Sequence, residues 1–263
     1  MRTISNNPLS IPTFSIADIK DDSMEDKSVV ERLVKNMVLV ESGIYLENIY
    51  DVKTFRGTII KKANPNAVEV DSFYISKYPV TQVEWKLIMG NDPSEYDVPD
   101  ENLPVFNVTY EQCLRFIAKL NRITGLKFDL PTQIQWDYAA HGDRTNNFHL
   151  EDKTYEEIAD HAWLDVKKPF PVGLKQPNTL GLYDMFGNLG ELCKRIEDKD
   201  IVKGGASTNR ERIWDSGGYY HYEDYWSEKN ISINDMSNIT PAITSADTIE
   251  SHICFLYCCL LSS

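Results

Sequence analysis

The stretch Gly181-Leu-Tyr-Asp-Met-Phe-Gly-Asn-Leu-Gly-Glu191 is the part of the chain that says most about its fold. It contains three glycines and two acidic residues, Asp184 and Glu191, and it follows neither a helical nor a strand-like hydrophobic pattern. Glycine and asparagine favour turns with positive φ, so the glycines and Asn188 predict a sharply bent backbone. Such a loop can direct carboxylate and carbonyl oxygens toward one hard cation. We therefore expect a bent loop with the donor atoms of a metal site.

Composition limits the class of protein. The chain has 263 residues, 42% hydrophobic and 11% aromatic, which is enough for a substantial core. A net charge of −13 argues against nucleic acid or an anionic membrane as the main partner. Residues 1–21 lack the apolar run of a signal peptide, and no later stretch resembles a membrane span. The default expectation is a cytoplasmic protein, although display on a cell surface or virion is also compatible.

The pattern along the chain predicts one domain over residues 37–263, preceded by an N-terminal arm and short helix over residues 1–36. The strands expected first are Met37–Gly43, Thr58–Lys61 and Ala67–Ser76. The region from residue 143 to residue 168 shows no strong period and is expected to be irregular.

Three capping boxes predict three helices. In each box a threonine accepts a hydrogen bond from the first helical turn, and a Glu or Gln three residues later reaches back. The boxes are Thr81-Gln-Val-Glu84, Thr109-Tyr-Glu-Gln112 and Thr132-Gln-Ile-Gln135. The helices should end at Gly90, Gly125 and Gly142.

The five cysteines include no CxxC pair. Cys113 falls on the apolar face of the second predicted helix and is expected in the core. Cys254, Cys258 and Cys259 lie in an apolar terminal run, which favours a buried last strand over a metal or acylation site.

The order of the motifs resembles the formylglycine-generating enzyme (sulfatase-modifying factor) family. The match covers about residues 37–206. The motifs that carry it are Met37-Val-Leu-Val-Glu-Ser-Gly43, Tyr78-Pro-Val-Thr-Gln-Val-Glu-Trp85, Met89-Gly-Asn-Asp-Pro-Ser94, Leu120-Asn-Arg-Ile-Thr-Gly125, Leu130-Pro-Thr-Gln-Ile-Gln-Trp-Asp-Tyr-Ala-Ala140, Gly181-Leu-Tyr-Asp-Met-Phe-Gly-Asn188 and Val202-Lys-Gly-Gly205. The resemblance implies an α+β, C-type lectin-like fold, with a small twisted antiparallel sheet, two to three helices and much irregular loop structure.

The family's oxidase activity depends on a copper-binding cysteine pair shortly after the Gly-Gly motif. Here the corresponding residues 204–214 contain no cysteine, and Asn209 and Trp214 stand where the thiols are needed. Neither side chain is a soft thiolate of the kind that Cu(I) prefers. We therefore expect no copper and no oxidase activity.

The resemblance also implies a structural calcium site. Its ligands correspond to the side chains of Asp184 and Glu191 and the backbone carbonyls of Gly187 and Leu189. The alternative is that Asp184 only caps a turn while Glu191 is solvated. A second calcium site would use the region around Asp160 and Asp165, where no ligand set is evident.

Residues 207–230 have the composition of a binding surface. They contain four tyrosines and two tryptophans among small polar residues, as binding loops often do. The alternative is a long loop whose aromatic side chains pack on the domain itself. The candidate ligand-binding residues are Asn209, Arg210, Arg212, Trp214, Asp215, Tyr219, Tyr220, His221, Tyr222, Asp224, Tyr225 and Trp226.

Variable proteins of diversity-generating retroelements share this fold and place adenine-templated residues after the Gly-Gly motif. Residues 215–222 stay within the set that such codons produce. The favoured function is thus a non-catalytic protein that binds a protein or cell-surface ligand through residues 207–230. Two other functions remain open: an oxidoreductase with a rearranged site, and a pseudo-enzyme that pairs with a catalytic homologue.

Overall fold

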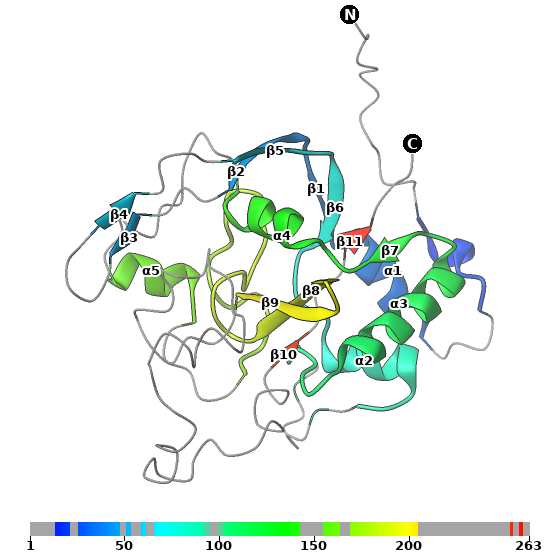
Figure 1. The fold of residues 1–263 in the computed structure, drawn as a ribbon. Coiled ribbons are helices and arrows are strands. Elements are labelled where there is room, and N and C mark those ends of the chain that lie inside the picture. The colour runs from blue at the N-terminus through cyan, green and yellow to red at the C-terminus, as the bar shows by residue number, and fades with distance from the viewer. Residues whose placement is uncertain are drawn as a thin grey trace, which may run out of the picture.

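The computed structural model describes residues 14–21, 26–47, 51–53, 59–61, 66–92, 94, 100, 102–142, 155–163, 169–204, 253–254 and 258–259. The main sheet has four antiparallel strands in the order β1-β6-β11-β7. These strands are β1 (Met37–Val40), β6 (Phe73–Ser76), β11 (Cys258–Cys259) and β7 (Phe128–Asp129). The C-terminal strand β11 thus lies in the middle of the sheet, between strands from the first half of the chain (Figure 1).

Two further antiparallel pairs lie in the first part of the chain. They are β2 (Gly43–Glu47) with β5 (Asn66–Val70), and β3 (Asp51–Lys53) with β4 (Ile59–Lys61). The strand predicted over Ala67–Ser76 is therefore two strands, β5 and β6, in different sheets. The chain bends at residues 71–72, and the backbone N–H of Ser42 donates to Ser72 Oγ across this bend at 2.9 Å.

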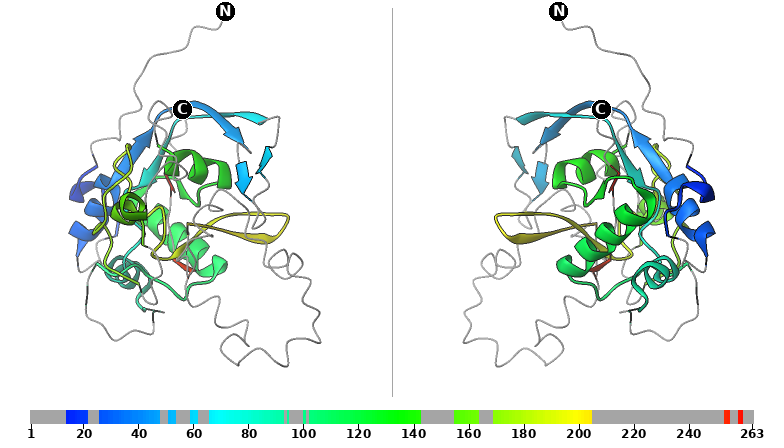
Figure 2. Two further views of the ribbon diagram at one scale, coloured as in Figure 1. Left: turned by 90° about the vertical axis from the view of Figure 1, so that its left-hand side faces the viewer. Right: turned by 90° about the vertical axis from the view of Figure 1, so that its right-hand side faces the viewer.

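A separate three-stranded sheet, in the order β10-β8-β9, is formed by strands from the last third of the chain. The antiparallel hairpin β8 (Gly190–Ile196) and β9 (Lys199–Gly204) is joined on the β8 side by β10 (Ile253–Cys254), which runs parallel to β8. The predicted closing strand is consequently divided between β10 and β11. Figure 2 shows the β8–β9 hairpin extending away from the main sheet.

The three predicted helices are confirmed, with all three capping boxes formed. They are α2 (Gln82–Met89), α3 (Tyr110–Thr124) and α4 (Gln133–Ala140). Gly90 and Gly125 follow α2 and α3 with φ of 85° and 74°, as a helix C-terminus in the left-handed region requires. Sequence reasoning missed α5 (Tyr155–His161), which lies inside the region expected to be irregular.

The N-terminal part of the chain contributes to the core. The short η1 (Ile16–Asp18) precedes α1 (Lys27–Lys35), whose buried side chains include Val30 and Leu33. These residues pack in one cluster with the buried faces of α2 and α3, including the predicted core residue Cys113. The domain boundary after residue 36 remains a prediction.

A second core cluster lies under the loop that precedes β8. It joins Phe73 and Ile75 of the main sheet, Trp136 of α4, and Leu182 and Met185 of the loop. Within the described ranges, no helix combines the length and apolar character needed to cross a membrane.

Candidate functional site

The loop from Gly181 to Glu191 bends as its glycines predict. Gly181 and Gly187 have φ of 81° and 88°, and Asn188 has φ of 59°. Asp184 also has a positive φ of 58°, which is uncommon for a residue with a side chain. Gly187 allows no side chain, because a Cβ atom there would lie 2.2 Å from the backbone carbonyl oxygen of Trp163. The loop therefore depends on its glycines for close packing as well as for turning.

Asp184 is buried and holds two other loops in place. Its Oδ1 accepts a hydrogen bond from Trp163 Nε1 at 2.9 Å, and its Oδ2 accepts one from the backbone N–H of Gly173 at 2.7 Å. Burial raises the pKa of Asp184 above the usual value of an aspartate, although both hydrogen bonds lower it. The carboxyl group of Asp184 is thus poorly solvated, and each of its two oxygens accepts one hydrogen bond.

Glu191 is fully buried at the start of β8. Its Oε2 accepts a hydrogen bond from Trp136 Nε1 at 2.5 Å, whereas its Oε1 has no hydrogen-bond partner. Burial raises the pKa of Glu191 to about 8, with a further contribution from the charge of Asp184 and an opposing one from Trp136. The alternative in which Glu191 is solvated is therefore wrong.

These residues fit a hard cation by their chemistry. The two carboxylates are oxygen donors, and the unpartnered Oε1 of Glu191 needs either a proton or a cation near it. In the described part of the chain, no three His, Cys, Asp or Glu side chains gather as metal ligands. A calcium site here would thus rely on Asp184 and Glu191 together with the carbonyls of Gly187 and Leu189, and that ligand set remains a prediction.

Two neighbouring residues of α4 hold the hairpin that follows the loop. Trp136 binds Glu191 of β8, and Asp137 Oδ1 lies 2.7 Å from Lys203 Nζ of β9. Glu191 and Lys203 are direct partners in the antiparallel register, so one turn of α4 contacts both members of a cross-strand pair. The side chains of Lys203 and Asp137 are only 2% and 3% exposed. The last residues before Gly205 are therefore anchored in the interior.

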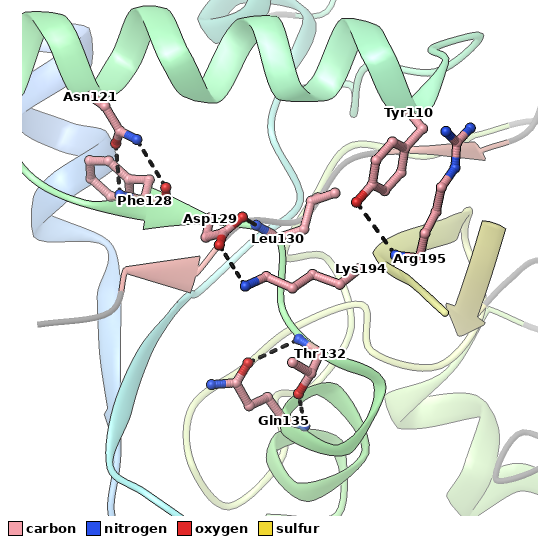
Figure 3. Close-up of polar contacts among 9 residues, drawn as sticks. All are labelled: Tyr110, Asn121, Phe128, Asp129, Leu130, Thr132, Gln135, Lys194 and Arg195. Carbon is pink, nitrogen blue, oxygen red and sulfur yellow. Dashed lines mark hydrogen bonds and ion pairs between the residues drawn. The ribbon is translucent and has the colours of Figure 1, made fainter. Parts of the chain in front are cut away.

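The outer part of β8 is held by exposed contacts (Figure 3). Lys194 Nζ lies 2.5 Å from Asp129 Oδ2 of β7, and the backbone N–H of Arg195 donates to the hydroxyl of Tyr110 at 3.4 Å. The guanidinium of Arg195 also lies 4.2 Å from the Tyr110 ring centroid and pairs with Glu111 of α3. The hairpin is consequently fixed to α3, α4 and β7 together.

The described structure ends the hairpin at Gly204, and all twelve candidate ligand-binding residues, from Asn209 to Trp226, lie outside the described residues. Of the residues considered for a second calcium site, Asp160 is exposed on α5 and Asp165 lies outside the description.

Two cysteine side chains are described, Cys113 and Cys193, and both are buried. Burial raises the pKa of Cys113 well above its usual range, so this thiol stays protonated. Cys193 lies in β8 and packs in the second core cluster.

Sequence reasoning missed four side chains of this site: Trp136, Asp137, Trp163 and Lys203. A signal existed for one of them. Lys203 stands two residues after the apolar Ile201, and strand alternation places both on one face, where both are buried. A lysine at a buried strand position needs a partner, but the sequence does not say that Asp137 supplies it.

A family model described as the sulfatase-modifying factor enzyme 1-like domain matches residues 23–239 of the chain. A curated relative, the chaperone protein LppX of Paenibacillus barcinonensis, is 26% identical over 210 residues, which cover 60% of this chain and 70% of that protein.

Solved structures show the same architecture. Treponema denticola variable protein 1 has a TM-score of 0.60 at 21% identity, with 85% of this chain and 94% of that chain covered. PvdO from Pseudomonas aeruginosa has a TM-score of 0.61 at 19% identity and covers 86% and 94%. CarF has a TM-score of 0.57 at 20% identity and covers 86% and 98%. At these identities the likeness shows the fold alone, and it confirms the predicted fold class.

Proposed function

The chain belongs to the family of the sulfatase-modifying factor enzyme 1-like domain, and from this premise we propose that it is a non-catalytic member that binds a protein ligand through residues 207–230. The observation that carries the proposal is the sequence after Gly204. Residues 204–214 lack the cysteine pair that oxidase chemistry in this family needs, and residues 207–230 are rich in tyrosine and tryptophan. A segment with this composition offers rigid aromatic contact area and adaptable hydrogen bonds.

The described cysteines do not favour a rearranged copper site. A Cu(I) site needs accessible thiolates, whereas Cys113 is buried on α3 with a raised pKa and Cys193 is buried in β8. We expect no copper-dependent oxygen uptake with a cysteine-bearing peptide as substrate. Uptake that depends on both copper and the peptide would contradict the non-catalytic assignment.

The geometry of the hairpin supports a display function. The buried ion pair between Lys203 and Asp137 lies one residue before Gly204, and β8 is tied to α3, α4 and β7. A binding segment that leaves a rigid base loses less conformational entropy when it contacts a ligand. The anchors thus suit a scaffold that tolerates changes in the segment it presents.

The relatives support the choice of ligand class. One curated relative is named a chaperone protein, which suits a protein as the ligand. One structure of the same fold is itself named a variable protein, which supports diversification of residues 207–230 by a retroelement. A reverse-transcriptase gene beside this one, with a near-repeat of its 3′ coding region that differs at adenines, would establish that version. If neither the reverse-transcriptase gene nor the near-repeat is present, residues 207–230 are not diversified by a retroelement. The proposal that they bind a protein ligand would still stand.

We also propose that the loop from Gly181 to Glu191 holds a structural calcium ion. The ion would be bound by Asp184, Glu191 and the carbonyls of Gly187 and Leu189. It would neutralise two carboxylates that burial disfavours, and it would brace the start of β8.

A display library tests the binding proposal. Codons 219, 220, 222 and 225 are randomised and the library is selected against several unrelated purified proteins. A matched library randomises four exposed residues of α3, namely Leu114, Arg115, Ala118 and Arg122. We expect specific binders from the first library only. Failure of the first library, or equal success of the second, would contradict a dedicated surface at 207–230.

A quadruple variant separates a binding surface from self-packing. Replacement of Tyr219, Tyr220, Tyr222 and Tyr225 by serine should change the free energy of unfolding by no more than about 0.5 kcal/mol per substitution, as for surface positions. The control Tyr74→Ser removes a ring that is 4% exposed in β6 and should cost about 3 kcal/mol or more. Urea titration measures both. If the quadruple variant loses as much stability as the control, the tyrosines pack on the domain.

A further inference from the structure

The short surface loop over residues 171–178 presents an apolar side chain on a rigid backbone. Leu174 is 62% exposed, more than any other large hydrophobic side chain in the described ranges. The backbone around it is held by three hydrogen bonds. Val172 N–H donates to the Asn102 carbonyl at 2.9 Å, Gly173 N–H donates to Asp184, and Gln176 N–H donates to the Asp160 carbonyl at 2.9 Å. Leu174 is therefore held in solvent by a fixed loop.

A lysine with two tyrosines lies on one side of Leu174. Lys77 Nζ is 5.4 Å from the ring centroid of Tyr78 and 5.3 Å from that of Tyr183, and the two ring centroids are 5.0 Å apart. Gly173 packs against Tyr78, because a Cβ atom at Gly173 would lie 2.7 Å from Tyr78 Cε1. The aromatic pair is thus adjacent to the loop that carries Leu174.

A second lysine with aromatic rings follows Leu174 directly. Lys175 Nζ lies 4.7 Å from the ring centroid of Trp163, and it donates to the Ala159 carbonyl at 2.5 Å. Trp163 in turn stacks on Phe170 with a centroid distance of 4.1 Å. Asp184 joins the two sides, since it accepts hydrogen bonds from both Trp163 and Gly173. Hydrogen bonds through Asp184 therefore connect the two lysine–aromatic groups to the loop that carries Leu174.

The charge of this surface differs from that of the molecule. Neither Lys77 nor Lys175 forms an ion pair with another described residue, although the chain carries a net charge of −13. Asp184 is buried, and its two oxygens accept hydrogen bonds from Trp163 Nε1 and from the backbone N–H of Gly173. Asp160 on α5 is an exposed carboxylate near Lys175, because its neighbour Ala159 accepts from that lysine. Two lysines that form no ion pair with any other described residue thus belong to the same group of contacts as the exposed Leu174.

We propose that the surface formed by Lys77, Tyr78, Trp163, Leu174, Lys175 and Tyr183 binds a short acidic peptide segment of a partner protein. An apolar side chain of the segment contacts Leu174 and the aromatic rings, and carboxylates on either side of it pair with Lys77 and Lys175. Ammonium groups held over aromatic faces keep donors for such carboxylates. A long polyanion is disfavoured by the −13 net charge, whereas repulsion of a short segment is screened beyond about 8–10 Å at physiological ionic strength.

The surface shares no residue with the segment 207–230, and its test can fail independently of the binding proposal above. A phage-displayed library of random dodecapeptides is selected on the full chain at about 0.15 M NaCl. We expect enriched peptides with Asp or Glu on both sides of Leu, Phe or Trp. Binding of one synthetic peptide from this set is then measured by fluorescence polarisation, and it should weaken as salt is raised.

Matched variants assign the binding to this surface. The double variant Lys77→Glu with Lys175→Glu, and the single variant Leu174→Ser, should each weaken binding by about tenfold or more. The charge control reverses two other lysines on helices, Lys35→Glu with Lys86→Glu, and should leave binding near the parent value apart from the change in net charge.

Three outcomes would overturn the proposal. One is the absence of enriched acidic peptides. Another is equal weakening by the patch and control variants. The third is a concentration-dependent dimer that Leu174→Ser abolishes in sedimentation experiments, since that result would assign the surface to a second copy of the chain. Unchanged peptide binding by the Tyr219, Tyr220, Tyr222 and Tyr225 serine variant is expected, and it separates this surface from residues 207–230.

Discussion

Replacement of Lys203 by methionine should lower the free energy of unfolding by about 3–5 kcal/mol, the cost of leaving one partner of a buried ion pair without the other. The ammonium of Lys203 lies 2.7 Å from Asp137 Oδ1, and both side chains are almost wholly buried. In the variant, Asp137 must either stay charged in the interior or take up a proton. Burial already raises the pKa of Asp137, and the positive charge of Lys203 is the strongest effect that lowers this pKa. Urea titration at pH 7 measures the loss.

The pH dependence of this variant follows from the direction of that pKa. A carboxyl whose pKa is higher in the folded state binds a proton on folding, so its contribution to stability falls as pH rises through the folded pKa. Loss of Lys203 raises the pKa of Asp137 further. The difference in the free energy of unfolding between the parent and Lys203→Met should therefore be smaller at pH 5 than at pH 7.

An exposed lysine in the same hairpin provides the control. Lys194 Nζ lies 2.5 Å from Asp129 Oδ2 (Figure 3). The two side chains, however, are 35% and 39% exposed. Lys194→Met should cost no more than about 1 kcal/mol, because water and salt screen such a pair. The double variant Lys203→Met with Asp137→Leu should recover much of the loss, since neither charge remains. Equal effects of Lys203→Met and Lys194→Met would show that the buried pair does not anchor the hairpin.

Removal of calcium should destabilise the parent by about 2.7 kcal/mol when the free ion had been at 100 times its dissociation constant. Without the ion, two carboxylates whose pKa values are raised by burial must be protonated or remain charged without a cation. Glu191→Gln should abolish the difference between calcium and chelator, because it removes the oxygen that has no hydrogen-bond partner. Thermal unfolding in calcium and in chelator, with calorimetric titration of calcium, measures both effects.

Glu84, a second buried glutamate, provides a control. It distinguishes the loss of a metal ligand from the loss of stability that any change of a buried glutamate causes. Glu84 is 6% exposed, its pKa is raised by burial, and it closes the capping box of α2. Glu84→Gln should lower stability yet keep the full difference between calcium and chelator. If chelation leaves the melting temperature of the parent unchanged, the loop does not hold structural calcium.

Much of the helical structure could be predicted from the sequence, because its determinants are local. Each capping box joins residues three apart, and in all three helices the side chain of Thr81, Thr109 or Thr132 accepts the expected bond. The burial of Cys113 also followed from helical spacing alone. Short strands were harder, because β5 and β6 end up in different sheets, where β5 pairs with β2 and β6 pairs with β1 and β11. Such pairing joins segments that are distant in the chain.

The candidate site was predicted in part. The bent, acidic loop and its residues Asp184 and Glu191 were found from glycine spacing and family resemblance. Their burial and their tryptophan partners were not found, since Trp136 and Glu191 are 55 positions apart and Trp163 and Asp184 are 21 apart. No local pattern predicts which distant donor meets a buried carboxylate.

By itself the sequence determined where α2, α3 and α4 begin, the sharp turns of the loop from Gly181 to Glu191 and the absence of cysteine from residues 204–214. These depend on backbone preferences and on hydrogen bonds between near neighbours. Only the tertiary structure decided that Glu191 is buried with one oxygen unpartnered, and that Lys203 meets Asp137 in the interior. It also placed Lys77 near the ring of Tyr78 and Lys175 near the ring of Trp163. The physical reason is that burial and charge pairing arise where segments distant in the chain pack together, and packing depends on all of them at once.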